Sequence, residues 1–151
     1  KKMKNLLMSV GVMLCLNANA QWTNKTVNNG FDEPYRICYT ATNNLGYLKL
    51  ENVDGQIFFY LNGKYCCDDS PVVNLSFIVN GVPVKYYCTA NVGDDKAIVW
   101  ILEDFLNSAV VESFKNCSTL NIRVNDTVCH EEIYSFNMSG STAALKFITN
   151  K

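Results

Sequence analysis

Histidine and arginine are scarce in this chain of 151 residues, which has one histidine, His130, and two arginines, Arg36 and Arg123. Neither arginine lies in a run of basic residues. Because nucleic-acid binding needs clustered lysine and arginine to neutralise phosphates, the sequence argues against a nucleic-acid partner. Beyond the first 20 residues no apolar run approaches the length of about 20 residues that a membrane-spanning helix needs. The sequence therefore predicts no nucleic-acid partner and no membrane span in the mature chain.

Catalytic signatures are also missing from the sequence. It has no Gly-x-Ser-x-Gly nucleophile motif and no glycine-rich phosphate loop. His130 stands beside Glu131 and Glu132 but has no second histidine with which to hold a metal, so we interpret it as a solvated strand end. Asp68-Asp69 and Asp94-Asp95 fall in predicted turns, where aspartate commonly makes local hydrogen bonds. The sequence predicts no catalytic residue, no cofactor and no metal site.

The first 20 residues have the three-part layout of a secretory signal peptide. Three lysines stand within the first four residues, an uncharged apolar run spans residues 6–16, and Ala18-Asn19-Ala20 supplies small residues at a cleavage site. We expect cleavage before Gln21. The remaining 131 residues then carry ten basic and 14 acidic side chains, for a net charge of about −4. The leader predicts an exported protein, periplasmic or extracellular after cleavage.

Cysteine is abundant in the predicted mature chain, and an even number of cysteines in an exported protein indicates disulfides. The six cysteines are Cys38, Cys66, Cys67, Cys88, Cys117 and Cys129. Cys66 and Cys67 are neighbours, and Cα atoms about 3.8 Å apart fit a mutual bridge poorly, so each should take a different partner. The hairpin at residues 72–89 favours a bridge from one of them to Cys88. The other pairings stay open.

Turn residues between alternating apolar residues predict several strands. Residues 47–51 and 56–61 flank Asn52-Val53-Asp54-Gly55, a hairpin signature. The clearest hairpin is 72–89, whose apolar residues alternate on both sides of Asn80-Gly81, a type I′ turn. Within it Pro83 lacks an amide hydrogen, which favours the edge of a sheet. Further strands are expected at 97–101, 119–124 and 127–138.

Two later segments indicate helices. From Leu102 to Lys115 apolar residues recur at steps of three and four, which predicts an amphipathic helix of about 14 residues. Ser141 is expected to cap a short C-terminal helix that ends near Ile148. Because hairpins dominate, the sequence predicts an α+β fold in which an antiparallel sheet is covered on one face by the helix at 102–115. Residues 21–36 are expected to form an extended arm, and 37–151 a single disulfide-stapled domain.

The second half of the chain resembles a known domain. From Leu75 to Leu145 the order is a hairpin, a short strand, a helix of the Leu-x-x-Phe-Leu kind and a strand, closed by Tyr134-Ser135-Phe136-Asn137-Met138-Ser139-Gly140-Ser141 and then Ala143-Ala144-Leu145. This pattern is similar to a domain of exported Gram-negative envelope proteins, which include accessory proteins of type VI secretion systems. The cysteine-rich first half departs from that pattern. The resemblance implies a binding or accessory role in the envelope and supplies no active-site residue.

Outward-facing aromatic residues give the best functional lead in the sequence. If the strands alternate, Phe58, Tyr60 and Tyr87 point away from the core, where aromatic rings suit contact with a protein or a glycan. We therefore expect a non-enzymatic envelope or secreted binding protein that presents a sheet surface. Two alternatives stay open: an enzyme inhibitor that presents the loop Asp68–Pro71, and a small secreted hydrolase that uses His130 with the aspartate pairs.

Overall fold

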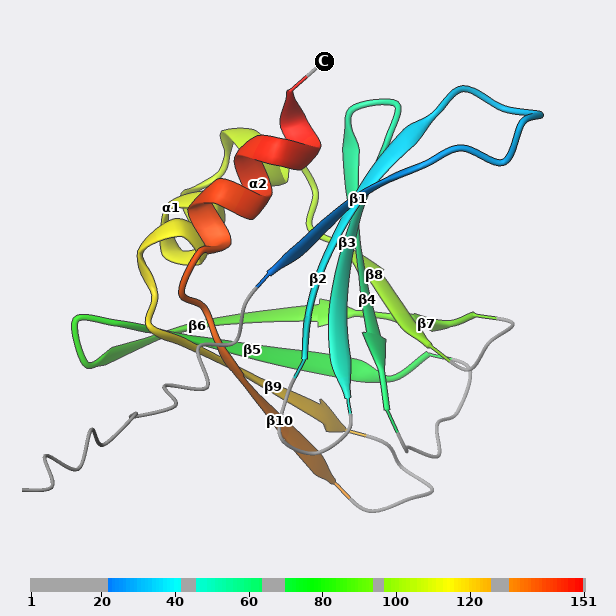
Figure 1. The fold of residues 1–151 in the computed structure, drawn as a ribbon. Coiled ribbons are helices and arrows are strands. Elements are labelled where there is room, and N and C mark those ends of the chain that lie inside the picture. Colours follow the sequence, from blue (N-terminus) through cyan, green and yellow to red (C-terminus); the bar gives the residue numbers. More distant parts are fainter. Residues whose placement is uncertain (1–21, 42–45, 64–69, 94–96, 126–130, 151) are drawn as a thin grey trace, which may run out of the picture.

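The computed structural model describes residues 22–41, 46–63, 70–93, 97–125 and 131–150 (Figure 1). The predicted signal peptide, residues 1–20, lies outside this part of the chain. The described residues form two antiparallel sheets and two α-helices, which confirms the α+β class expected from the sequence. The strands of the smaller sheet run across those of the larger one (Figure 1), an arrangement in which the two inner faces form a shared core.

The larger sheet, sheet A, has six strands in the order β1-β2-β3-β4-β8-β7. Their bounds are β1 Thr23–Val27, β2 Tyr35–Ala41, β3 Tyr47–Val53, β4 Gln56–Asn62, β7 Asn91–Val92 and β8 Ile98–Ile101. Side chains alternate along each strand, so that in β4 Ile57, Phe59 and Leu61 are buried in the core. The stretch 21–36, expected as an arm, contains the edge strand β1, which pairs with β2 over its whole length.

The smaller sheet, sheet B, has four strands in the order β10-β9-β5-β6. Their bounds are β5 Val72–Val79, β6 Val82–Thr89, β9 Thr119–Asn125 and β10 Glu132–Asn137. β5 is a central strand that buries Val73, Leu75 and Phe77. β6 is an edge strand, as Pro83 indicates, because proline cannot donate a hydrogen bond to a further strand.

Two hairpins owe their turns to residues that accept positive φ. Asp54 and Gly55 join β3 to β4 with φ of 51° and 88°, and Asn80 and Gly81 join β5 to β6 with φ of 50° and 79°. Positive φ at both central positions defines the type I′ turn, whose twist matches that of the strands it joins. The Gly55 amide also donates to the Asn52 side-chain oxygen at 2.9 Å. Both hairpins predicted from the sequence are therefore confirmed.

The helix expected over residues 102–115 is divided in two. A 3₁₀ turn, η1, spans Phe105–Asn107, and helix α1 spans Ala109–Asn116. Ser108 is extended and separates η1 from α1, and Asp104, with a left-handed φ of 51°, separates η1 from the residues before it. The apolar spacing is still used, because Phe105, Val111 and Phe114 are all buried.

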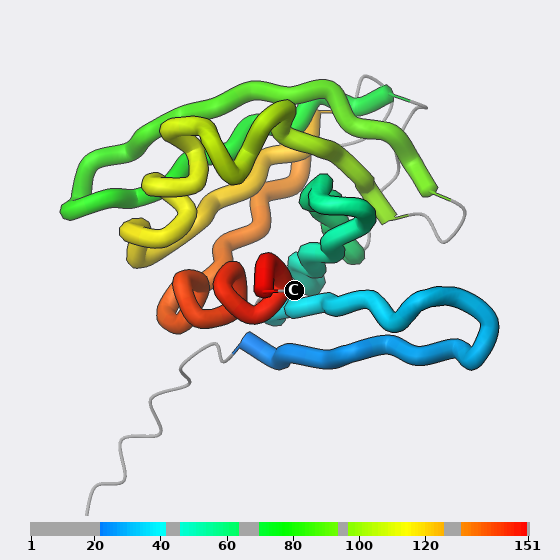
Figure 2. Tube along the Cα trace, turned by 90° about the horizontal axis from the view of Figure 1, so that it is seen from above, coloured from blue at the N-terminus to red at the C-terminus, as the bar shows by residue number. Residues whose placement is uncertain are grey.

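The C-terminal helix, α2, spans Ser141–Thr149 and confirms the short helix predicted there. Gly140, with a φ of 87°, precedes it as the capping residue, so the expectation that Ser141 caps the helix is wrong. Ser141 is the first helical residue, and its hydroxyl donates to the Phe114 carbonyl oxygen of α1 at 2.9 Å. Figures 1 and 2 show the two helices side by side at one end of the molecule, between sheet B and the hairpin of β1 and β2.

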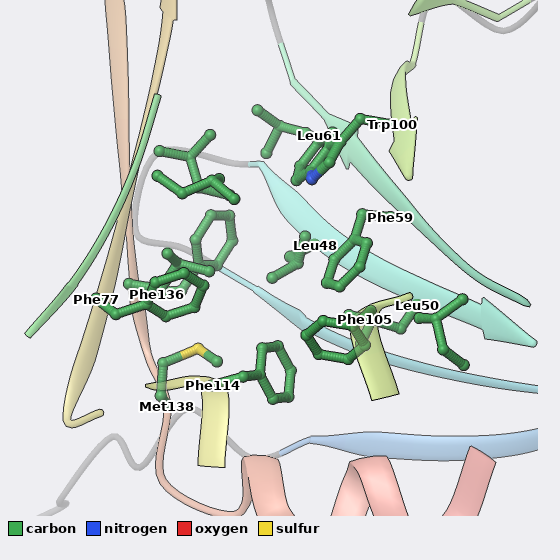
Figure 3. Packing of buried hydrophobic residues seen from close by; sticks show 14 of the residues in the cluster. Leu48, Leu50, Phe59, Leu61, Phe77, Trp100, Phe105, Phe114, Phe136 and Met138 are labelled. Atoms are coloured by element: carbon green, nitrogen blue, oxygen red, sulfur yellow. The ribbon is translucent and has the colours of Figure 1, made fainter. Parts of the chain in front are cut away.

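Aromatic rings fill the centre of the core (Figure 3). Phe59 of β4 stacks on Trp100 of β8 with ring centroids 5.6 Å apart, and meets Phe105 and Phe114 edge-on at 5.1 and 6.3 Å. Such pairs add about 0.5–1.5 kcal/mol each beyond the burial of apolar area. One strand of sheet A is thereby tied to β8, to η1 and to α1.

The end of α2 is held by two polar side chains of sheet A. The Arg36 guanidinium of β2 donates to the carbonyl oxygens of Phe147, at 3.1 Å, and Asn150, and lies 5.4 Å from the centre of the Phe147 ring. Asn52 of β3 donates to the Ile148 carbonyl oxygen at 2.8 Å. The last carbonyls of a helix lack intrahelical partners and carry partial negative charge, which a cation stabilises. No helix among the described residues is long and apolar enough to cross a membrane.

Candidate functional site

The three aromatic residues predicted to point outward do so, but they lie on two different sheets. Phe58 and Tyr60 are half-buried on the side of β4 that faces away from the core. Tyr87 lies on β6 of sheet B, with 70% of its surface exposed. The structure therefore offers two separate candidate surfaces, one on the outer side of each sheet.

The outer side of sheet A carries a cluster of apolar side chains, called here the aromatic face. Its members are Ile37, Tyr39, Tyr47, Phe58, Tyr60, Val99 and Ile101. The strand register aligns Tyr39, Tyr60 and Val99 across β2, β4 and β8, with Lys49 of β3 between the two tyrosines. A second row runs from Ile37 through Glu51 and Phe58 to Ile101. Helix α2 packs on the opposite side of the sheet, where Arg36 and Asn52 contact it, and Phe114 of α1 meets Phe59 on the same side.

Contacts within the aromatic face hold its side chains in place. The Lys49 ammonium lies 3.8 Å from the centre of the Tyr60 ring and 3.2 Å from the Glu51 carboxylate. The Tyr39 and Tyr47 rings meet edge-on with centroids 6.4 Å apart, and each is more than a third exposed. A face ordered in this way loses little side-chain entropy when a partner binds.

The sequence analysis missed five members of this face, namely Ile37, Tyr39, Tyr47, Val99 and Ile101. The sequence contained part of the information needed to find them. Tyr39 follows the buried Cys38 and Tyr47 precedes the buried Leu48, which is the alternation expected of strands that have one face in the core. What the sequence does not give is the pairing of β4 with β8, which places Ile101 beside Phe58. The face is assembled from strands that are distant in the chain.

The outer side of sheet B is polar and is called here the amide face. Its members are Asn74, Ser76, Lys85, Tyr87, Asn121, Arg123, Ile133 and Ser135. They form two rows across the sheet: one joins Ile133, Arg123, Asn74 and Tyr87, and the other joins Ser135, Asn121, Ser76 and Lys85. A hollow of about 420 Å³ lies over these rows.

Hydrogen bonds on the amide face leave one acceptor unused. The Ser135 hydroxyl donates to the Asn121 side-chain oxygen at 2.5 Å, and the Arg123 Nε lies 3.2 Å from a Glu131 carboxylate oxygen. The Asn74 side-chain oxygen is buried within the described structure and has no hydrogen-bond partner. A buried acceptor without a donor costs about 1–3 kcal/mol, so this oxygen favours a ligand that supplies one.

A second hollow, of about 620 Å³, lies where the β1–β2 hairpin and the β3–β4 turn meet the end of α2. Its acidic lining residues are Asp32, Glu33, Glu51 and Asp54. Its one arginine, Arg36, is already bonded to the helix carbonyls, and Glu51 is paired with Lys49. We interpret this hollow as the structural junction of sheet A with α2.

The cysteines that the structure describes are not cross-linked. Cys38, Cys88 and Cys117 have free thiols, so the predicted disulfides, including a bridge to Cys88, are not confirmed for these three residues. They lie in β2, in β6 and after α1, and no strand pairing brings two of them together. Burial raises the pKa of the Cys38 and Cys88 thiols to about 12 and that of Cys117 to about 11, which disfavours the reactive thiolate. Cys66, Cys67 and Cys129 lie outside the described residues.

The residues weighed for catalysis also fall outside the described part of the chain. These are His130, Asp68-Asp69 and Asp94-Asp95. Of the loop Asp68–Pro71, only Ser70 and Pro71 are described. Within the described ranges, no group of three or more histidine, cysteine, aspartate or glutamate side chains is arranged to hold a metal ion. No family model, curated protein or solved structure matches this chain.

Proposed function

We propose that this chain is an exported, non-enzymatic binding protein that recognises a protein partner through the aromatic face of sheet A. The observation that carries the proposal is the set of seven apolar side chains on the side of the sheet opposite the helices. Tyr39, Tyr47 and Ile101 are exposed, and the other four are half-buried. Clusters of accessible apolar side chains, rich in tyrosine and phenylalanine, are typical of protein contact surfaces. The aliphatic members Ile37, Val99 and Ile101 favour a protein over a glycan, because sugar binding relies more on hydrogen-bonding groups.

The tip of the β1–β2 hairpin adds a second apolar contact at the end of the same sheet. Phe31 is 94% exposed there, on a hairpin that projects from the molecule (Figures 1 and 2). The tip is held by its own side chains: the Asn29 side-chain oxygen accepts hydrogen bonds from the amides of Phe31 and Asp32, both at 3.0 Å. A large apolar side chain presented on an ordered turn resembles the anchor residues that dominate binding energies.

The charge at the hairpin tip indicates what kind of partner would bind there. Asp32 and Glu33 follow Phe31 directly and are exposed. An anionic membrane surface would repel these carboxylates, whereas a protein pocket with an apolar floor and a basic rim would fit both groups. We therefore propose a protein partner with such a pocket. Export is proposed from the leader alone, and an accessory role in a bacterial envelope from the sequence resemblance alone.

Affinity capture with matched variants tests the proposal. The mature chain from Gln21 would be compared with a double variant, Tyr39→Ala with Tyr47→Ala, with Phe31→Ala, and with the control Tyr87→Ala on the other sheet. A true partner is recovered with the wild type and the control but lost with the aromatic-face variant. The purified partner should then bind Phe31→Ala at least tenfold more weakly, as expected for an anchor residue.

The outcome that would overturn the proposal is equally concrete. If every captured protein is recovered equally with the aromatic-face variant and with Tyr87→Ala, this face is not the contact surface. If sedimentation shows that the wild type associates with itself at high concentration, the occupant of this face is instead a second copy of the chain. Thermal unfolding of each variant confirms that a loss of binding is not a loss of fold.

A further inference from the structure

We propose that the amide face of sheet B binds an acidic saccharide, that is, a short sugar chain bearing carboxylate or sulfate groups. This inference concerns a different sheet from the proposed protein contact and does not depend on it. The hollow over the face, about 420 Å³, lies in the range of about 300–1,000 Å³ that is usual for ligand sites. The face is formed by strands rather than loops, so its side chains are presented on a rigid frame.

Tyr87 supplies a platform on which a sugar ring can lie. It is 70% exposed on the edge strand β6, and the register places Asn74 next to it in the same row. An aromatic ring offers an apolar surface to the C–H groups of a sugar, while neighbouring amides bond to its hydroxyls. Ile133, at the other end of the row, gives a second apolar contact.

The unused acceptor of Asn74 indicates a ligand that carries donors. Its side-chain oxygen is buried without a partner at the centre of the face. A turn of the Asn74 side chain toward the hollow would bring this buried oxygen within reach of a sugar hydroxyl, which can donate to it as neither a bare carboxylate nor an inorganic sulfate can. On the same face Ser76 and Asn121 add further polar groups beside it. The ligand therefore needs hydroxyl groups as well as charge.

Two cations flank the hollow and indicate that the ligand is anionic. Lys85 and Arg123 are both exposed, on β6 and β9, with β5 between them. They lie two strand spacings of about 4.8 Å apart and are offset by two residues along the strands, so their Cα atoms are about 12 Å apart, which suits two charged groups along a chain better than one small ion. Two cations are too few to follow a nucleic-acid backbone. The Glu131 carboxylate disfavours an anionic ligand, because it pairs with Arg123 at 3.2 Å and competes for its charge.

Titration calorimetry with three defined saccharides tests the inference on the mature chain. Tetragalacturonate and a heparin-derived tetrasaccharide carry carboxylate and sulfate groups, and fully methyl-esterified tetragalacturonate is the neutral control. We expect at least one acidic tetrasaccharide to bind, and to bind at least fivefold more tightly than the neutral ester. The comparison of the two acidic ligands identifies which anionic group is recognised. Raising the salt concentration should weaken the binding.

Variants assign the binding to the amide face. Tyr87→Ala should weaken it about tenfold, and Lys85→Gln and Arg123→Gln about two- to fivefold each, the size expected of exposed charge contacts. Glu131→Gln should strengthen it about two- to threefold, because it removes the competing carboxylate. Tyr39→Ala on the aromatic face serves as the matched control and should leave affinity unchanged.

Three results would overturn the inference. One is that none of the three saccharides binds. Another is that the neutral ester binds as tightly as the acidic tetrasaccharides. The third is that Tyr87→Ala and Lys85→Gln bind like the wild type. None of these results affects the proposed protein contact, whose test uses variants of sheet A.

Discussion

The outer faces of the two sheets differ in chemistry although both sheets use the same core. The inner sides of sheets A and B meet in one cluster of aromatic and aliphatic residues. On the outside, sheet A presents tyrosine, phenylalanine and isoleucine, whereas sheet B presents asparagine, serine, lysine and arginine around one exposed tyrosine. Strand formation and core packing constrain only the inner residues. The outer residues are free to differ, which is why we assign them to different ligands.

Phe59 and Phe58, which are neighbours in β4, test this division between inner and outer residues. Their variants should show the largest difference in stability. Phe59→Ala removes a ring that contacts Trp100, Phe105 and Phe114, so it should lower the free energy of unfolding by about 3–5 kcal/mol. Phe58→Ala on the aromatic face should cost less than half as much, because that ring is half-buried. Urea unfolding of both variants measures the difference. Equal losses would mean that the aromatic face is covered in the native protein.

Alkaline pH tests the buried thiol of sheet A. Burial raises the pKa of Cys38 from its ordinary value of 9.0 to about 12, so the folded protein keeps a proton that the unfolded chain releases. Stability from this group is complete below pH 9 and is lost as pH rises toward 12, by up to about 1.4 kcal/mol per pH unit. Cys38→Ala should flatten the decline measured by urea unfolding between about pH 8 and 10 under reductant. A wild type and variant with parallel pH profiles would show that Cys38 is not a buried free thiol.

The two arginines of the chain, one on each sheet, differ in what they hold. Arg36→Ala should lower the free energy of unfolding by about 1–3 kcal/mol, because it removes a charged donor from the last carbonyls of α2. Arg123→Ala should cost at most about 1 kcal/mol, since its ion pair with Glu131 is half-exposed. Thermal unfolding compares the two. If Arg123→Ala lowers the free energy of unfolding more than Arg36→Ala does, the structural roles assigned to the two arginines are wrong.

The smallest expected effect concerns the ordering of the aromatic face. Lys49→Met keeps the length of the side chain but removes its charge from the Tyr60 ring and from Glu51. The loss in unfolding free energy should be about 1 kcal/mol, because this cation–π contact is partly shielded from solvent, the Lys49 side chain being 27% exposed. It should shrink further at high salt, where the pairing with Glu51 is screened. A loss as large as that of Phe59→Ala would instead place Lys49 in the core.

The sequence predicted those parts of the fold that depend on neighbouring residues. Asp54-Gly55 and Asn80-Gly81 gave both hairpins because their φ preferences are local, and Pro83 gave the edge strand for the same reason. The division into two sheets could not be predicted, because it depends on which distant strands pair, such as β4 with β8. The break between η1 and α1 was missed because apolar spacing alone does not record that the backbone of Ser108 is extended.

The candidate surfaces were predicted only residue by residue. Strand alternation placed Phe58, Tyr60 and Tyr87 outward, yet it could not show that Tyr87 belongs to another sheet. The neighbours that give each surface its character come from other strands: Lys49 and Ile101 beside Phe58 and Tyr60, and Arg123 beside Asn74. The composition shows that arginine is rare. It does not show that Arg36 and Arg123 each pair with a defined partner.

The position of α2 has a consequence for how the chain folds. The Arg36 hydrogen bond to Phe147 joins residues 111 positions apart. Ala144, Leu145 and Ile148 complete the packing that the first strands begin. The interior is therefore complete only when the strands of sheet A and this helix, far apart in the sequence, have come together. Because a large loop must close before such contacts form, we expect the closing of this interface to be a slow step in folding.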